Sequence, residues 1–77
     1  MIDEPGTVVL MTDLPRHGLR AGDLGTGASV HQDGKGYTVE FATLGGDTIA
    51  VVTLSVAQIR PTRANDIAHV REVAPAS

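Results

Sequence analysis

Short runs of alternating hydrophobic and polar residues fill most of this chain, and turn-forming residues separate them at intervals of roughly eight to twelve positions. β-Branched residues are frequent in the runs at 7–11, 37–43 and 48–54, and a glycine-containing run lies at 24–31. This spacing is typical of a small all-β barrel or sandwich. No apolar stripe with a helical period is long enough to compete with that interpretation. We therefore predict strands in these four runs and a brief closing strand at 59–61.

Glycine-containing turns join the runs into a meander. An Asp-Gly pair at 33–34 precedes the third run, and Gly-Gly-Asp at 45–47 follows it. Such turns between alternating runs are typical of β-hairpins. In the third run, Tyr37, Val39 and Phe41 share one face and include both aromatic residues of the chain. We therefore predict that this face points into the core.

The second and fourth runs depart from simple alternation. Gly25 and Gly27 share one face of the second run, which indicates strong curvature or close approach by another backbone. The fourth run is apolar on both faces. It therefore suits a central strand, or a strand whose outer face, with Ile49 and Val51, meets a partner.

The segments outside the runs complete a single domain over residues 1–77. The long connection at 12–23 carries two leucines that we expect to tuck onto the end of the barrel. A helical turn capped by Ser55 precedes the closing strand. The remaining segments are a predicted loop at 62–66, a stretch at 67–73 that can form a sixth strand, and a frayed tail at 74–77.

The order of these elements favours an SH3-like barrel of five short strands. A strand is followed by a long loop, a three-stranded meander, a one-turn helix and a short closing strand. An OB-fold is the main alternative. It needs a longer helix between its third and fourth strands, and residues 44–47 are enough for about one helical turn only.

Short motifs follow one another in a fixed order through almost the whole chain. They are D-L-P at 13–15, G-L at 18–19, G-D-L-G-T at 22–26, Y-T-V-E-F at 37–41, V-T-L at 52–54, I-R-P at 59–61 and I-A-H-V-R-E-V at 67–73. Together they resemble a family of short bacterial proteins whose function is not established. The resemblance implies an SH3-like barrel and a free-standing small protein, and it brings no catalytic residues. The stretch at 22–26 is also similar to the opening of KOW and Tudor-like barrels.

Charge and hydropathy narrow the class of protein further. Six lysines and arginines against nine aspartates and glutamates give a net charge of −3, which argues against a dedicated nucleic-acid binder. No apolar stretch reaches the roughly 18 residues that a membrane span needs. The acidic first residues lack the basic-then-apolar order of a signal peptide, so we predict a cytoplasmic protein.

The hydrophobic residues are mostly small aliphatics. They make up 42% of the chain, with one Tyr, one Phe and no Trp. No cysteine is present, so neither a disulfide nor a thiolate metal site can stabilise the fold. A core with so little aromatic area must pack tightly or be completed by a partner.

The connection after the first strand is the first candidate binding site. Leu14 and a cluster of positive groups, Arg16, His17 and Arg20, lie in the loop with which SH3-like barrels usually bind their ligands. Surface loops carry function more often than strands do. Solvated side chains in a turn-rich loop are the simpler interpretation of the same residues.

No pattern of catalytic or metal-binding residues emerges from the sequence. His17, His31 and His69 match no ligand spacing, and scattered histidines in an acidic chain are more often surface residues. The serines lie in no nucleophile elbow. Asp23, in the glycine-rich stretch, is expected to accept backbone N–H bonds within a turn. We therefore predict a protein that is not an enzyme and holds neither a metal nor a cofactor.

The later strands carry a second candidate surface. Glu40 is expected to pair across strands with Arg60 or Arg71, as a surface ion pair or as a group that orients a partner. The complete set of candidate partner-binding residues is Leu14, Arg16, His17, Arg20, Glu40, Ile49, Val51, Arg60, Val70 and Arg71.

Two main classes of function follow. The first is a protein-binding accessory module, either an immunity or antitoxin-like partner of a basic target or a homo-oligomer that pairs through an exposed edge strand. The alternative is a KOW-like barrel that binds RNA or the ribosome through Arg16, Arg20 and Lys35. A stabilising small subunit of a larger enzyme is a third class. Neither a membrane nor a small-molecule substrate is expected.

Overall fold

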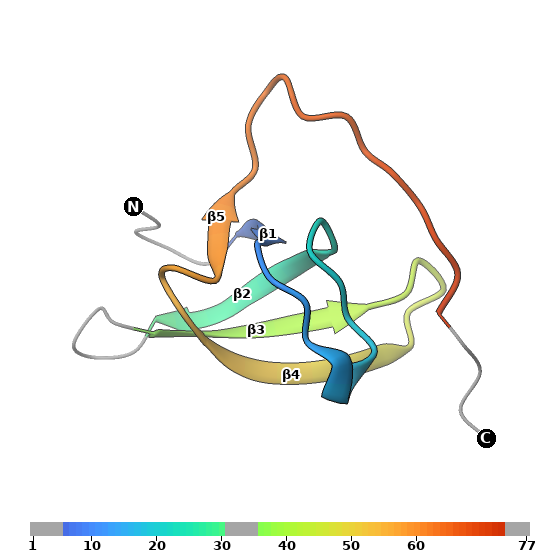
Figure 1. Ribbon diagram of the computed structural model, residues 1–77, viewed down its shortest axis with the longest axis horizontal. Coiled ribbons are helices and arrows are strands. Elements are labelled where there is room, and N and C mark those ends of the chain that lie inside the picture. Colours follow the sequence, from blue (N-terminus) through green and yellow to red (C-terminus); the bar gives the residue numbers. More distant parts are fainter. Residues whose placement is uncertain (1–5, 31–35, 74–77) are drawn as a thin grey trace.

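The computed structural model describes residues 6–30 and 36–73. These residues form one antiparallel sheet with the strand order β4-β3-β2-β1-β5 (Figure 1). Its elements are β1 (Thr7–Leu10), the 3-10 helix η1 (Pro15–His17), β2 (Leu24–Val30), β3 (Gly36–Ala42), β4 (Thr48–Ser55) and β5 (Ile59–Pro61). The five predicted strands are present, and the all-β class is confirmed. The predicted turn at 33–34 and the predicted frayed tail at 74–77 lie outside the described residues.

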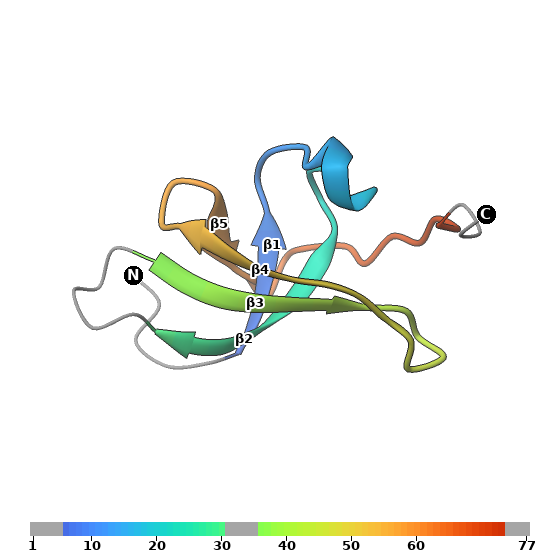
Figure 2. The same ribbon diagram turned by 90° about the horizontal axis from the view of Figure 1, so that it is seen from below.

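The sheet bends over on itself, because β1 and β5 run across the direction of β3 and β4 (Figure 2). Each strand pairs antiparallel with its neighbour. In the described part of the chain, β4 and β5 are the two edges of the sheet and do not pair with each other. The strand order, the long first connection and the turn before β5 are compatible with the predicted SH3-like domain. No helix among the described residues is long and apolar enough to cross a membrane.

The core gathers side chains from four strands and from the first loop. The predicted inward face of β3 is confirmed, since Tyr37, Val39 and Phe41 are 3%, 0% and 2% exposed. The buried cluster consists of Val8, Leu10, Leu19, Tyr37, Val39, Phe41, Leu54 and Ile59. Partly buried Leu14, Ile49, Ala50 and Val52 pack against it.

Gly25 in β2 lies directly against this core. A Cβ atom at Gly25 would lie 2.6 Å from Val39 Cγ1, 2.8 Å from Phe41 Cε1 and 3.1 Å from the carbonyl O of Glu40. These distances are shorter than the roughly 3.5–4.0 Å of an ordinary carbon–carbon contact. The predicted close approach of another backbone is confirmed at the carbonyl O of Glu40, and the side chains of Val39 and Phe41 on the inward face of β3 come closer still.

A bulge in β4 changes which of its residues face the core. The pairing of β4 with β3 skips Ile49, so β4 has one extra residue at this point. A bulge interrupts the alternation of side chains along a strand. As a result, Ile49 and Ala50 both pack against the core. The prediction that Ile49 lies on the outer face is wrong, whereas Val51 is 59% exposed there.

The turn before β5 is held by a different side chain from the predicted one. The N–H of Gln58 donates to the carbonyl O of Ser55 at 3.0 Å. In return, the N–H of Ser55 donates to Oε1 of Gln58 at 2.9 Å. Gln58, rather than Ser55, thus provides the side-chain cap of this turn.

After β5 the chain leaves the sheet, as Figure 1 shows. Arg60 donates to both carboxylate oxygens of Asp66 at 3.0 Å, and the N–H of Arg63 donates to Asp66 Oδ2 at 2.7 Å. These bonds close the predicted loop and turn the chain away from β5. Residues 67–73 form no strand, so the possible sixth strand is absent from the described part of the chain. We refer to residues 62–73 as the C-terminal arm.

Replacement of Gly25 is expected to destabilise the protein. Gly25→Ala should lower the free energy of unfolding by about 1–3 kcal/mol, because the added methyl group overpacks the core. Gly45→Ala is the matched control, since the nearest atom to a Cβ there is Thr43 Oγ1 at 3.8 Å. The control should change stability by no more than about 0.5 kcal/mol. Urea unfolding followed by circular dichroism measures both variants, and equal stabilities would contradict the close approach.

Candidate partner-binding groove

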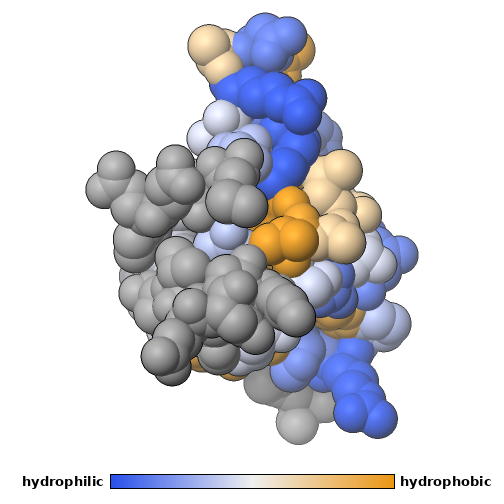
Figure 3. Space-filling view, turned by 90° about the vertical axis from the view of Figure 1, so that its left-hand side faces the viewer, coloured by the Kyte–Doolittle hydropathy of each residue, from blue (hydrophilic) through white to orange (hydrophobic). Residues whose placement is uncertain are grey.

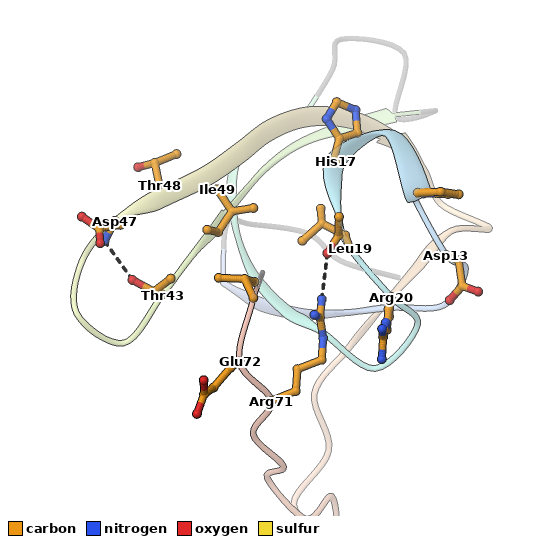
Figure 4. A pocket seen from close by; sticks show the side chains of 13 residues that line it. Asp13, His17, Leu19, Arg20, Thr43, Asp47, Thr48, Ile49, Arg71 and Glu72 are labelled. Atoms are coloured by element: carbon orange, nitrogen blue, oxygen red, sulfur yellow. Dashed lines mark hydrogen bonds between the residues drawn. The ribbon is translucent and has the colours of Figure 1, made fainter. Parts of the chain in front are cut away.

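A groove of about 840 Å³ opens where the first loop faces the β3–β4 turn (Figure 4). Its walls come from three segments: the first loop, the turn with the start of β4, and the end of the C-terminal arm. The residues that line it are Asp13, Pro15, His17, Gly18, Leu19, Arg20, Thr43, Asp47, Thr48, Ile49, Arg71, Glu72 and Val73. Segments that are far apart in the sequence therefore meet at this site.

The backbone of the first loop fixes its shape. Leu14 and Leu19 exchange two N–H···O=C bonds of 2.9 and 3.1 Å around η1. Gly18 ends η1 with a φ of 68°, a left-handed conformation that favours glycine. Leu19 is buried and Leu14 packs against the core, so both leucines fold back onto the body of the domain as predicted. Leu14 therefore belongs to the packing of the core rather than to an open binding surface.

The basic residues of this loop lie on the surface of the protein. Arg16, His17 and Arg20 are exposed. His17 and Arg20 line the groove, whereas Arg16 does not. Figure 4 shows His17 above the centre of the groove and Arg20 below it. Part of the predicted binding loop thus faces the groove directly.

The groove combines an apolar centre with an acidic rim. Leu19 and Ile49 lie near its centre, and Asp13, Asp47 and Glu72 lie around them (Figure 4). Asp13 Oδ1 accepts a backbone N–H at 2.9 Å. Among the described residues, no cationic side chain forms an ion pair with any of these three carboxylates. Their negative charge is therefore available to a positively charged group of a ligand.

One ion pair joins the C-terminal arm to the first loop. Arg71 donates from Nε to Asp23 Oδ1 at 3.0 Å and from Nη2 to Asp23 Oδ2 at 2.5 Å. The same Nη2 donates to the carbonyl O of Gly18 at 3.0 Å. The side chains of Arg71 and Asp23 are only 26% and 20% exposed. A two-bond contact between guanidinium and carboxylate fixes orientation as well as position.

The surroundings of Asp23 favour its charged form. Burial acts to raise the pKa of Asp23, but the hydrogen bonds from the Arg71 side chain and from the Arg20 N–H, with the charges of both arginines, lower it below 3.8. The bond to Asp23 in turn raises the pKa of Arg71. The N–H of Arg20 lies 2.8 Å from Asp23 Oδ2. The prediction that Asp23 accepts a backbone N–H bond is therefore confirmed.

Glu40 has a different partner from the predicted arginines. Its Oε2 accepts a hydrogen bond from Thr48 Oγ1 at 2.8 Å. Arg60 binds Asp66 instead, and this bond lowers the pKa of Asp66 to about 2. The sheet order explains the error, because β2 and β1 separate β3 from β5 and so keep Arg60 away from Glu40.

Apart from Leu14 and Arg16, which are described above, the structure separates the predicted partner-binding residues into three groups. They are His17, Arg20, Ile49 and Arg71 in the groove, Glu40 and Val51 opposite each other on the outer face of β3 and β4, and Arg60 and Val70 at the base and in the middle of the arm. Nothing in the sequence marks the acidic rim, since Asp13, Asp47 and Glu72 lie in two separate turns and in the arm.

Other surfaces of the described residues are less suited to binding a partner. The described part of the face in Figure 3 is mostly hydrophilic, with a small hydrophobic area near its centre. Met11, Leu24 and Val56 are about half exposed, at 49%, 47% and 48%, and they lie in different segments. Half-exposed hydrophobic residues are normal, because apolar atoms contribute more than half of the accessible surface of a folded protein. The groove is therefore the better candidate for a binding site.

Metal-binding side chains do not gather in the described residues. No three of their His, Cys, Asp or Glu side chains form a group that could hold a metal ion. His31 lies outside the described residues. That the protein is not an enzyme and has no cofactor stays a prediction.

The sequence model of one family covers well over half of the chain. It describes DUF4926, a domain of unknown function, and it matches residues 5–61. The chain belongs to this family. The predicted relation to a family without an established function is thereby confirmed, while the series of motifs stays a prediction. No curated protein and no solved structure matches the chain. The DUF4926 match ends at Pro61, so the C-terminal arm lies outside it.

The pKa of Asp23 predicts how stability depends on pH. Because its folded value lies below 3.8, Asp23 contributes stability above about pH 4, and this stability is lost as the pH falls through the folded pKa. We expect the unfolding free energy to decrease on acidification, and to decrease less steeply in Asp23→Asn. Urea unfolding over a pH series measures this.

The matched control for the pH series is Asp47→Asn, since Asp47 forms no ion pair among the described residues. This variant should follow the wild-type pH dependence. Identical slopes for wild type and Asp23→Asn would show that the contact between Asp23 and Arg71 contributes no pH-dependent stability.

Proposed function

We propose that this protein is a small protein-binding module without enzymatic activity, and that its groove binds an extended segment of a partner that carries a basic side chain. The observation that carries this proposal is the combination of an apolar centre at Leu19 and Ile49 with acidic side chains around it. The net charge of −3 adds attraction to a basic partner.

An extended peptide suits this arrangement of groups. Successive side chains of such a peptide point in opposite directions, so alternate residues can enter the apolar centre. A neighbouring basic residue then meets Asp47 or Glu72 at the rim. Because Arg20 lies at another side of the groove, its charge disfavours the reverse orientation of a basic segment.

We further propose where the protein acts and what kind of partner it has. A bacterial, cytoplasmic partner that covers a basic target, as immunity or antitoxin-like proteins do, is consistent with the acidic surface. The stabilisation of a larger enzyme as its small subunit would use the same kind of contact. In each of these roles the protein acts through binding alone.

Binding of RNA is the weaker alternative. Stacking of bases on aromatic side chains is a common feature of RNA-binding sites, but Tyr37 and Phe41 are buried. Arg16 and Arg20 are exposed, yet the groove beside Arg20 carries three carboxylates. Lys35 lies outside the described residues.

Affinity capture with a charge reversal tests the proposed function. The full-length tagged protein is used to capture partners from its native cells, and Asp47→Lys should weaken the capture of a specific protein by at least about tenfold. The fold should tolerate this change, because Asp47 holds its turn with its backbone: its N–H donates to Thr43 Oγ1 and its carbonyl O accepts the N–H of Thr43.

Glu40→Lys is the matched control, because it makes the same change of charge on the outer face of β3. If only this control reduces capture, the partner binds the outer face and the groove assignment is wrong. If the captured component is RNA with a steep salt dependence, the protein-binding proposal is wrong. A lack of any specific partner contradicts it as well.

A further inference from the structure

Ion pairs hold the C-terminal arm at its two ends. At the base, Arg60 binds Asp66, and at the far end, Arg71 binds Asp23. Residues 67–70 between them are exposed and make no hydrogen bond within the described part of the chain. The middle of the arm therefore does not determine whether Arg71 binds Asp23 of its own chain or Asp23 of another copy.

The middle of the arm also exposes hydrophobic side chains. Ile67 is 91% exposed and Val70 is 74% exposed. Figure 1 shows this part of the arm arching away from the sheet. Since the body of the same chain leaves both residues in water, their burial would be gained only on association with another surface.

We propose that two copies of this chain exchange their C-terminal arms, so that Arg71 of each copy binds Asp23 of the other. The contact to Asp23 and to the carbonyl O of Gly18 is the same in either arrangement, because the two bodies are identical. Exchange of an identical element is a low-cost route to a symmetric dimer. In such a dimer the two arms run past each other, and Ile67 and Val70 can pack where they cross.

The charges favour an arm of this sequence as the occupant of this site, whether it comes from the same copy or from a second one. Asp23 already receives two hydrogen bonds from Arg71 and one from the backbone of Arg20, so the docking site is complementary to this arm. Exchange leaves no charge unpaired. Binding of the arm to its own chain is favoured by a high effective concentration. The dimer is therefore the more stable arrangement only if the hydrophobic contact between the two arms outweighs this advantage.

The exchange has a consequence for the groove. Arg71, Glu72 and Val73 line it from the arm. In the dimer, each groove is thus completed by the other copy. This inference goes beyond the proposed function, because it concerns contacts between two copies of this chain. It can be tested by measuring the oligomeric state without any partner protein.

Charge reversal in separate chains tests the exchange. The wild type is expected to sediment as a dimer at tens of micromolar. Asp23→Arg and Arg71→Asp each bring like charges together, so each variant alone should be a monomer. When the two variants are mixed in equal amounts, opposite charges meet at both exchanged contacts, and native mass spectrometry should detect the heterodimer by its mass.

Two results of this experiment would overturn the proposal. One is a wild type that stays monomeric at these concentrations. The other is a mixture without heterodimer, while the double variant Asp23→Arg with Arg71→Asp folds stably, because the pair then forms within one chain.

Ile67→Asp keeps the proposal testable if either charge reversal fails to fold. Ile67 is 91% exposed, so its replacement should leave the body intact. The variant is expected to associate at least about tenfold more weakly than the wild type. Leu44→Asp is the control, since Leu44 is 97% exposed in the β3–β4 turn, and it should leave the dimer unchanged. An equal effect of both variants, or of neither, would overturn the exchange.

Discussion

The close approach of Gly25 to Val39 and Phe41 is the constraint on which the rest of the structure depends. A chain with two aromatic residues has little large apolar area, so its core must gain stability from tight packing. The absence of a Cβ at Gly25 lets β2 lie against the inward face of β3. Asp23 stands just before β2, and its carbonyl O accepts the N–H of Leu10 at 2.9 Å. The same packing therefore places the carboxylate that receives the C-terminal arm.

The sequence predicts those parts of the fold that local patterns determine. Alternation along β3 identifies its inward face, because each residue's side is set by its own position in the strand. The side of Ile49 could not be predicted in this way, since a bulge is a property of the pairing between two strands. Residues 67–73 have the composition of a strand, but a strand needs a neighbouring edge. The bond between Arg60 and Asp66 turns the chain away from that edge.

The candidate site was predictable only in part, for a similar reason. The first loop is recognisable as a candidate binding loop from its own residues, and its leucines are recognisable as anchors. Asp23 and Arg71 are 48 positions apart, and no local pattern connects them. Sheet order decides that Glu40 is not the partner of Arg60. The acidic rim arises in the same way, from residues of three segments that only the folded chain brings together.

The contact between Asp23 and Arg71 also makes the groove a property of the whole chain. The DUF4926 match ends at Pro61, yet Glu72 contributes to the acidic rim from beyond that point. Glu72 follows directly after Arg71, so the bond that holds the arm also determines where this carboxylate lies. A ligand attracted by the rim would therefore depend on the ion pair between Arg71 and Asp23. The fold supplies the apolar centre, and the arm supplies part of the charge that would orient a partner.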